Sequence, residues 1–195
     1  MSISQAVILC GGPGTRLNDQ VRFQPAIETP KPLMEVGGKP FVTYAINMLK
    51  GIGVSDIVLL VGHLEEEFDF LDEIKGVRLV TTQENVNRAV LAIPKLQATF
   101  VLLNGDCFPI MDWRAFVDRE NPVNLPKVAV KIVDRDAGIA IVAKEDILSN
   151  RINCADILGM LEIYKAYTIL GGLHIGTYQG LERARQFMDL VVFGQ

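Results

Sequence analysis

AVILCGGPGTRL at residues 6–17 and ETPKPLMEVGGKP at residues 28–40 decide the fold of this chain of 195 residues. The first stretch opens with an apolar run at residues 6–10, which has the length and composition of a buried strand. Gly11 and Gly12 follow at once, and glycines just past a strand let backbone N–H groups approach a ligand closely. The stretch therefore predicts a strand that leads into a binding loop.

The loop after this strand carries groups that suit a polyphosphate. Gly14 and Thr15 continue it, and Arg16 adds a planar guanidinium that is always charged. Lys31 adds a flexible ammonium group and stands between two prolines that stiffen the backbone around it. Backbone donors with two cations nearby predict a site for a chain of phosphates.

The loop has three other interpretations, and the spacing of its glycines bears on the first two. A P-loop needs G-x-x-x-x-G-K-[ST], and that spacing does not occur here. A dinucleotide fingerprint needs G-x-G-x-x-G; Gly12 and Gly14 fit its start, but position 17 is Leu, which disfavours a nicotinamide-dependent oxidoreductase. An ordinary strand-to-helix turn remains open for the glycines taken alone.

Strands and helices are predicted to alternate after the loop. Apolar residues at helical spacing predict helices at 41–52 (with Pro40 in the first turn), 64–74 and 86–96. Short apolar runs predict strands at 56–61, 77–80 and 99–103. This order predicts β-α-β units and a mainly parallel sheet. The loops after Cys10 and Leu103 would then share the carboxyl edge of the sheet, where ligands bind in open α/β sheets.

The second half of the chain is less regular, and its elements are predicted more coarsely. We expect a helix at 113–119, a hairpin of strands 128–133 and 139–143 with its turn at 136–138, a weak helix at 152–164, a strand at 167–170 and a helix at 181–192. No repeat or linker interrupts the sequence. We expect a single domain over 1–195, with a regular first half at about 1–110 and a less regular second half at about 111–195.

Composition narrows the class of function. A net charge of −4 without a basic cluster argues against nucleic acid as a partner. The N-terminus has no basic segment before a long apolar run, and no apolar stretch reaches the roughly 20 residues of a membrane span. We therefore expect a cytoplasmic protein with no membrane partner. The cysteines show no metal-ligand spacing, and Cys10 and Cys107 are expected to be small buried residues.

GG-x-G-TRL after an N-terminal strand, then PKP and GGKP, resembles the signature of the sugar-1-phosphate nucleotidyltransferases. The closing stretch LGGLHIGTYQGLERARQFM at 170–188 is similar to that of heptose and mannose 1-phosphate guanylyltransferases, while LCGG and MEVGGKP also resemble glucose-1-phosphate cytidylyltransferases. The resemblance implies a Rossmann-like three-layer α/β sandwich of the nucleotide-diphospho-sugar transferase type. It implies that the half at about 1–110 binds the nucleotide and that the half at about 111–195 is a reduced sugar-binding half. It also implies transfer of a nucleotidyl group from a nucleoside triphosphate to a sugar 1-phosphate in nucleotide-sugar biosynthesis, with release of pyrophosphate.

The resemblance also assigns roles to residues. Arg16 and Lys31 would be catalytic: Arg16 would hold the β- and γ-phosphates, and Lys31 would bring the sugar phosphate and the α-phosphate together. Asp106, just beyond a predicted strand in NGD, would hold Mg²⁺, although from the residues alone NGD also fits a simple turn. Gln83 would contact the base edge, or is a solvated loop residue. The residues expected to bind the nucleotide are Gly11, Gly12, Gly14, Thr15, Gln83 and Asp106.

Departures from the family pattern leave a second hypothesis open. His174 stands where the closing motif has its second metal-binding Asp, and neutral imidazole suits Mn²⁺ or Zn²⁺ better than Mg²⁺; alternatively His174 is a packed side chain. Residues 85–89 (NVNRA) replace a glycine-rich segment, with Arg88 as a substitute phosphate contact, and the sugar-binding half is short. The chain could therefore be a catalytically silent binding or regulatory module. Family members commonly form homo-oligomers, so assembly is also an expectation.

Overall fold

The computed structural model describes residues 3–12, 29–81, 85–119, 128–132, 135–157, 159–160, 164–169 and 171–193. The first half contains β1 (Gln5–Leu9), η1 (Lys31–Leu33), β2 (Glu35–Val36), β3 (Lys39–Pro40), α2 (Val42–Gly51), β4 (Asp56–Val61), η2 (Glu65–Leu71), β5 (Val77–Thr81) and α3 (Val86–Ala92). The second contains β6 (Thr99–Asn104), β7 (Cys107–Ile110), α4 (Trp113–Arg119), β8 (Val128–Ile132), β9 (Arg135–Ala143), α5 (Lys144–Leu148), β10 (Lys165–Ile169), β11 (Gly171–His174) and α7 (Tyr178–Phe193).

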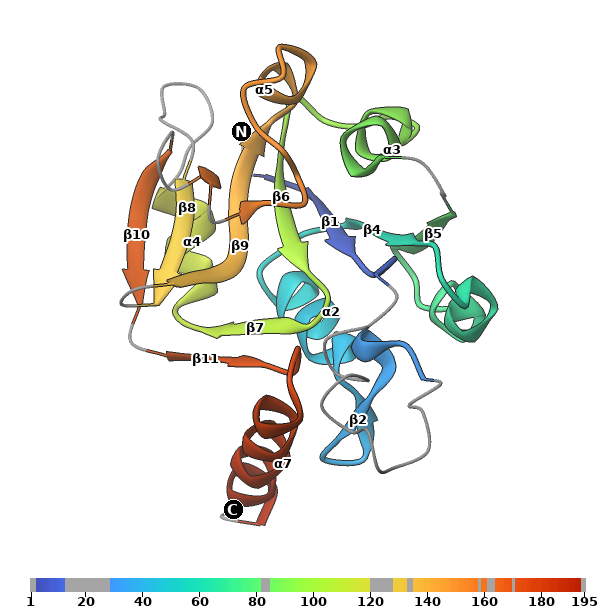
Figure 1. Cartoon of the computed structure of the whole chain (residues 1–195), viewed down its shortest axis with the longest axis vertical. Coiled ribbons are helices and arrows are strands. Elements are labelled where there is room, and N and C mark those ends of the chain that lie inside the picture. The colour runs from blue at the N-terminus through green and yellow to red at the C-terminus, as the bar shows by residue number, and fades with distance from the viewer. Residues whose placement is uncertain are drawn as a thin grey trace.

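A seven-stranded sheet in the order β10-β8-β9-β6-β1-β4-β5 forms the centre of the molecule (Figure 1). β1 is parallel to both β4 and β6, and β4 is parallel to β5. β9 runs antiparallel to its neighbours β6 and β8. The predicted α/β class with a mainly parallel sheet is confirmed.

Helices cover both faces of the sheet, which gives three layers. Alternate residues of β1 show why: Ala6 and Ile8 pack with α2, η2 and α4, whereas Val7 packs with α3 and α5. These three side chains have no exposed surface. A strand buried on both faces must be apolar at every position, which is why the run at 6–10 shows no alternation.

The loops after β1 and β6 lie side by side at the carboxyl edge of the sheet. Leu9 pairs with Asn104 in the register of the two strands, and the Gly105 backbone N–H donates to the Leu9 carbonyl at 2.9 Å. On the other side, the Cys10 N–H donates to the carbonyl of Leu60 in β4, also at 2.9 Å. The prediction that both loops share this edge is confirmed.

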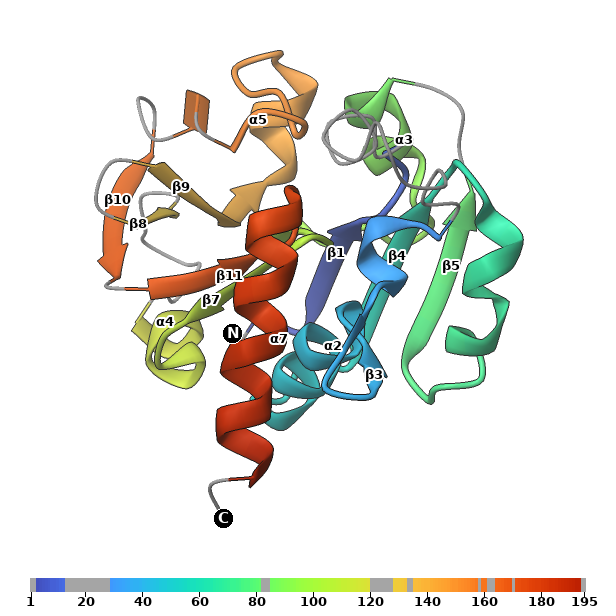
Figure 2. The same ribbon diagram turned by 60° about the horizontal axis from the view of Figure 1, so that its bottom comes forward.

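Outside the large sheet, β7 and β11 pair antiparallel into a ribbon of two strands, which leads into α7. Figure 2 shows α7 passing in front of this ribbon, with α2 on the side nearer to β3. Ile175, Leu181 and Ala184 bury apolar surface against a small cluster that includes Val36 and Phe41. The C-terminal segment is thereby held against η1, β2 and the start of α2. No helix among the described residues is both long and apolar enough to cross a bilayer.

Three sequence predictions are corrected by the structure. Pro40 pairs with Glu35 in the β2–β3 hairpin, so α2 begins after it and not with it in the first turn. The acidic segment forms the 3-10 helix η2, shorter than the predicted helix, with Phe68 buried beneath it. The hairpin turn is not at 136–138: β9 already starts at Arg135, and Gly138 lies within the strand. Glycine is needed at position 138 of the strand because the backbone there lies close to the Cys107 side chain: a Cβ at Gly138 would lie 2.5 Å from the Cys107 Sγ.

Asp56 gives the fold an acid-sensitive contact at the start of three strands. Arg78 Nε donates to Asp56 Oδ1 at 2.8 Å, and the side chain of Gln5 donates to Oδ2. The Arg78 hydrogen bond is the largest cause that lowers the pKa of Asp56; partial burial opposes it. A depressed pKa in the folded state means that this stabilisation is complete above the unfolded pKa of about 3.9 and is lost as the pH falls through the folded value.

We therefore expect Asp56→Asn to lower the free energy of unfolding at pH 7, and the difference from wild type to shrink as the pH falls below about 4. Urea unfolding at a series of pH values measures both effects. Asp69→Asn, an exposed position on η2, is the matched control and should change little at any pH. An Asp56→Asn deficit that stays constant down to acid pH would contradict the role of this carboxylate.

Candidate active site

The turn between β6 and β7 places Asp106 at the carboxyl edge of the sheet, directly after Gly105. A Cβ at Gly105 would lie 2.9 Å from the Leu9 carbonyl oxygen and 2.9 Å from Pro32 Cγ. A residue with a side chain would have to push these neighbours apart. Glycine at this position therefore lets the end of β1, the segment around Lys31 and Asp106 meet at one point.

The β7–β11 ribbon brings His174 to Asp106. His174 pairs with Cys107 across the two strands, so the two side chains are on the same face of the ribbon. His174 Nε2 lies 3.4 Å from Asp106 Oδ2, and the Cys107 thiol donates to Asp106 Oδ1 at 3.4 Å. In the described part of the chain, these three side chains form the one group of His, Cys, Asp or Glu residues arranged closely enough to hold a metal ion.

Lys31 reaches the same place from η1. Its residue is 9% exposed, and Nζ donates to the carbonyl oxygen of Gly176 at 3.4 Å. Pro30 and Pro32 flank it, which fixes the backbone φ on both sides. Its positive charge also acts on Asp106. The structure thus brings together two of the residues predicted to handle phosphates and metal, Lys31 and Asp106.

Charge around Asp106 keeps its carboxyl ionised. Burial is the largest single influence and on its own raises the pKa. The hydrogen bond and charge of His174, the Cys107 hydrogen bond and the charge of Lys31 together outweigh it, so the pKa lies below its ordinary value. The site therefore presents a carboxylate, the form that binds a cation.

Gly176 packs against this cluster so closely that a side chain at its position would overlap the His174 ring. A Cβ built at Gly176 would overlap the His174 Nε2 atom and lie 3.2 Å from Asp106 Oδ2. Glycine at this position therefore lets the backbone pack closely against the His174 ring and the Asp106 carboxylate. Gly176 also supplies the carbonyl that Lys31 contacts, so this residue lies next to Lys31, His174 and Asp106.

The remaining predicted site residues divide into two groups. Gly11 and Gly12 are exposed just beyond β1, at the same edge as Asp106. Gly14, Thr15, Arg16 and Gln83 lie outside the described residues, so their assigned roles stay predictions.

Two residues of the site were not anticipated, Cys107 as a neighbour of the metal-binding carboxylate and Gly176. Cys107 was predicted to be buried, and it is, at 8% exposure. Its contact with His174 depends on a strand pair between distant parts of the chain, which leaves no local signal. Gly176 could have been noticed as the glycine two positions after His174.

A metal with the preferences of Mg²⁺ fits this cluster through one residue. Mg²⁺ is bound through one or two carboxylates together with substrate phosphates and water, and Asp106 is such a carboxylate. Imidazole and thiol are poor ligands for it, so His174 and Cys107 do not contribute. The family's implied metal can therefore be held here by Asp106, with phosphate oxygens supplying further ligands.

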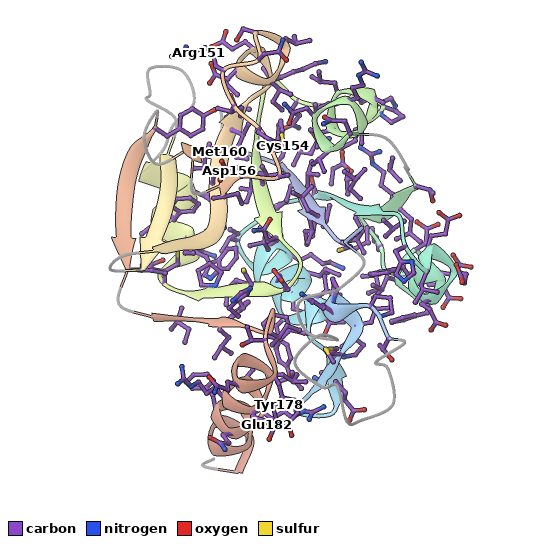
Figure 3. The ribbon with its side chains drawn as sticks, in the orientation of Figure 1. Arg151, Cys154, Asp156, Met160, Tyr178 and Glu182 are labelled. Atoms are coloured by element: carbon purple, nitrogen blue, oxygen red, sulfur yellow. The ribbon has the colours of Figure 1, made fainter. Side chains whose placement is uncertain are left out.

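A second feature is a hollow of about 900 Å³ between α3, α5 and the segment 150–160. Arg88, the sequence's alternative phosphate contact, lines it together with Asn87 and Arg151. Figure 3 shows Arg151 at the top of the molecule, Asp156 lower down in the upper half, and Tyr178, at the start of α7, in the lower half.

Asn87 links α3 to the segment at 152–154. Its Nδ2 donates to the Ile152 carbonyl at 2.9 Å, and its Oδ1 accepts from the Cys154 N–H at 2.7 Å. The side chain therefore ties α3 to the segment at 152–154, and so closes one wall of the hollow.

Comparison with known proteins agrees with this geometry. Residues 6–103 match the family model of the MobA-like NTP transferase domain. The choline-phosphate cytidylyltransferase of Streptococcus pneumoniae is 46% identical over 76 residues, which are 39% of this chain and 31% of that protein. The D-glycero-alpha-D-manno-heptose 1-phosphate guanylyltransferase of Campylobacter jejuni is 28% identical over 152 residues, which are 74% of this chain and 66% of that protein.

The likeness to solved structures extends over nearly the whole chain. The crystal structure of HddC from Yersinia pseudotuberculosis superposes with a TM-score of 0.74 at 20% identity, covering 95% of this chain and 99% of the other. At this identity the likeness shows the fold. Among the first three curated relatives, the matched segment spans between 17% and 66% of the relative's own length.

Proposed function

Because the chain belongs to the family of MobA-like NTP transferase domains, among the sugar-1-phosphate nucleotidyltransferases, we propose that it transfers a nucleotidyl group from a nucleoside triphosphate to a sugar 1-phosphate. The products would be a nucleotide-sugar and pyrophosphate. The observation that carries the proposal is the meeting of Lys31 and Asp106 beside Gly11 and Gly12, at the edge where the loops after β1 and β6 adjoin.

The proposed chemistry needs no protein nucleophile. A phosphate oxygen of the acceptor attacks the α-phosphorus of the triphosphate, a new P–O bond forms, and the bond to the departing pyrophosphate breaks in line. Both reactants are anions, so their mutual repulsion is the main barrier to bringing them together. Positioning and charge neutralisation by the protein would supply most of the acceleration.

Lys31 suits the task of neutralisation. Its ammonium group is held in a buried position, where a charge acts more strongly than in water. We propose that it contacts the α-phosphate and the acceptor phosphate, while Arg16 holds the β- and γ-phosphates. Asp106 would hold the divalent ion, Mg²⁺ or Mn²⁺, which when bound supplies Lewis-acid neutralisation of phosphate oxygens.

The proposal also covers the identity of the acceptor and of the nucleotide base. The relatives named above are described as acting on choline phosphate and on a heptose 1-phosphate, and another is a 2-aminoethylphosphonate cytidylyltransferase from Lancefieldella rimae. All three acceptors are small molecules with one phosphate or phosphonate group. We propose an acceptor of this class, a hexose or heptose 1-phosphate first, with guanylyl or cytidylyl transfer.

His174 favours a second candidate, a nucleotide-binding module without turnover. It pairs with Asp106 at 3.4 Å, in the position where the closing motif that this chain resembles has a second carboxylate. One carboxylate fewer leaves less negative charge to hold a dication against the phosphates. Such a module would bind the nucleotide and release no pyrophosphate.

Thermal unfolding with ATP, GTP, CTP, UTP and dTTP, each with Mg²⁺, Mn²⁺ or no metal, tests the binding step. At a concentration 100 times the dissociation constant, a ligand of the native state adds about 2.7 kcal/mol to stability, so the midpoint must rise. We expect one triphosphate to raise the midpoint in a metal-dependent way. If none does, the proposal fails.

Pyrophosphate release then separates the two candidates. The triphosphate that binds is incubated with hexose and heptose 1-phosphates, choline phosphate and 2-aminoethylphosphonate. Steady release with one of them supports the transferase and excludes the silent module. Binding without release from any acceptor supports the module.

A further inference from the structure

Cys107 gives the cluster at the β6–β7 turn a ligand that the proposed transferase chemistry does not use. Asp106, Cys107 and His174 offer one oxygen, one sulfur and one nitrogen, all within 4.8 Å of one another. Sulfur and imidazole nitrogen are preferred by Zn²⁺ and Co²⁺, whereas Mg²⁺ prefers oxygen alone. The chemistry of this set therefore selects a different class of ion from the one that would accompany a triphosphate.

The distances fit a tetrahedral ion of that class. Bonds of about 2.0–2.2 Å to nitrogen or oxygen and about 2.3 Å to sulfur place tetrahedral ligands about 3.4–3.6 Å apart. The separation is 3.4 Å between His174 Nε2 and Asp106 Oδ2, and 3.4 Å between Cys107 Sγ and Asp106 Oδ1. Each of the two contacts, one to either carboxylate oxygen of Asp106, thus has the separation of neighbouring ligands, and the ligand atoms of the three side chains all lie within 4.8 Å of one another.

The scaffold holds these groups in place without the ion. Cys107 and His174 are directly opposite each other in the β7–β11 ribbon, and Asp106 precedes Cys107 in the chain. Gly138 packs closely against the Cys107 side chain from β9, where a Cβ would lie 2.5 Å from Sγ. A site whose ligands are fixed in advance loses little conformational entropy when the metal binds.

We infer that Asp106, Cys107 and His174 form a three-ligand site for a thiophilic divalent metal, Zn²⁺ or Co²⁺, which the protein binds without nucleotide. On binding, the Cys107 thiol loses its proton to the buffer and the sulfur forms a bond to the metal, while His174 binds through Nε2. A fourth position stays open to water or a ligand, as in zinc sites with three protein ligands. The inferred site shares Asp106 with the proposed function, and the inference goes beyond that function because binding of this metal needs neither a triphosphate nor an acceptor.

Cobalt spectroscopy tests the site on the full chain, freed of metal with a chelator. Addition of Co²⁺ without nucleotide should produce a near-ultraviolet thiolate-to-cobalt charge-transfer band and the intense visible bands of four-coordinate Co²⁺. Cys107→Ser should abolish the charge-transfer band and weaken Co²⁺ binding at least about tenfold, the equivalent of 1.4 kcal/mol. The matched control is Cys154→Ser, which should behave as wild type. Cys154 is buried in the hydrophobic cluster between the sheet and helices α3 and α5.

The inference is overturned if wild type shows no charge-transfer band, or if the band survives in Cys107→Ser. Thermal midpoints without metal show whether each variant is folded. If Cys107→Ser does not fold, proton release from wild type decides: Zn²⁺ binding in a weak buffer should release about one proton per ion. Release of none overturns the inference. Because no nucleotide is present, failure here is distinguishable from failure of the proposed transferase.

Discussion

Replacing Lys31 with methionine is expected to lower kcat/KM for pyrophosphate release about 10²–10³-fold, the range found when one preorganised stabilising group is removed from an active site. Lys31 is buried, and its ammonium group is held beside Gly176 and close enough to Asp106 to affect the charge there. A cation at that position would offset repulsion between the two phosphates as they meet. Methionine keeps the length and apolar character of the stem, so the loss reports on the charge.

Lys39→Met is the matched control for this variant. Lys39 lies in the β2–β3 hairpin, and its residue is exposed. The control should retain wild-type kcat/KM. Lys31→Arg, which keeps a charge in a different shape, should recover part of the activity. Wild-type turnover by Lys31→Met, with an unchanged thermal midpoint, would show that Lys31 does not act on the phosphates.

Gly176→Ala should reduce kcat/KM about 100-fold, because a displacement of about 1 Å in an active site can cost that much. The new Cβ would overlap His174 Nε2, and the ring would have to rotate away from it. Rotation would break the contact of 3.4 Å with Asp106. Because the end of a side chain can move more cheaply than backbone, we expect the thermal midpoint to fall only slightly.

Gly171→Ala separates this effect from a general effect of alanine in the same segment. Gly171 lies at the other end of β11, and a Cβ there would meet nothing within 4 Å. Activity and midpoint should both stay near wild type. A Gly176→Ala protein with full activity would mean that the His174–Asp106 pair has no part in turnover.

The fold of the first half of the chain was predictable because its signals are local. The run at 6–10 and the strand β4 are buried on both faces, so hydrophobicity alone marks them. The family resemblance based on the glycine loop is confirmed by the model that matches residues 6–103. The later hairpin was misplaced, because a glycine needed for packing against Cys107 looked like a turn glycine.

The candidate site was predictable in part. Asp106 was singled out because the family that the chain resembles has a Gly-Asp after this strand, and His174 because it stands within the closing motif. Cys107 was missed as a partner because β7 and β11 have only four residues each, too few to show a periodic pattern. Their pairing is set by tertiary structure, and no local stretch of sequence encodes it.

The β7–β11 ribbon has a consequence for the order of folding. Lys31 and Gly176 are separated by 145 residues in the chain, and contacts of this range close a long loop before they contribute stability. Strands β1, β4, β5 and β6 can pair while the C-terminal segment is still being synthesised, since N-terminal parts fold first. The first half of the chain would then be largely formed before β11 docks, and His174 and Gly176 would complete the candidate site in the final step.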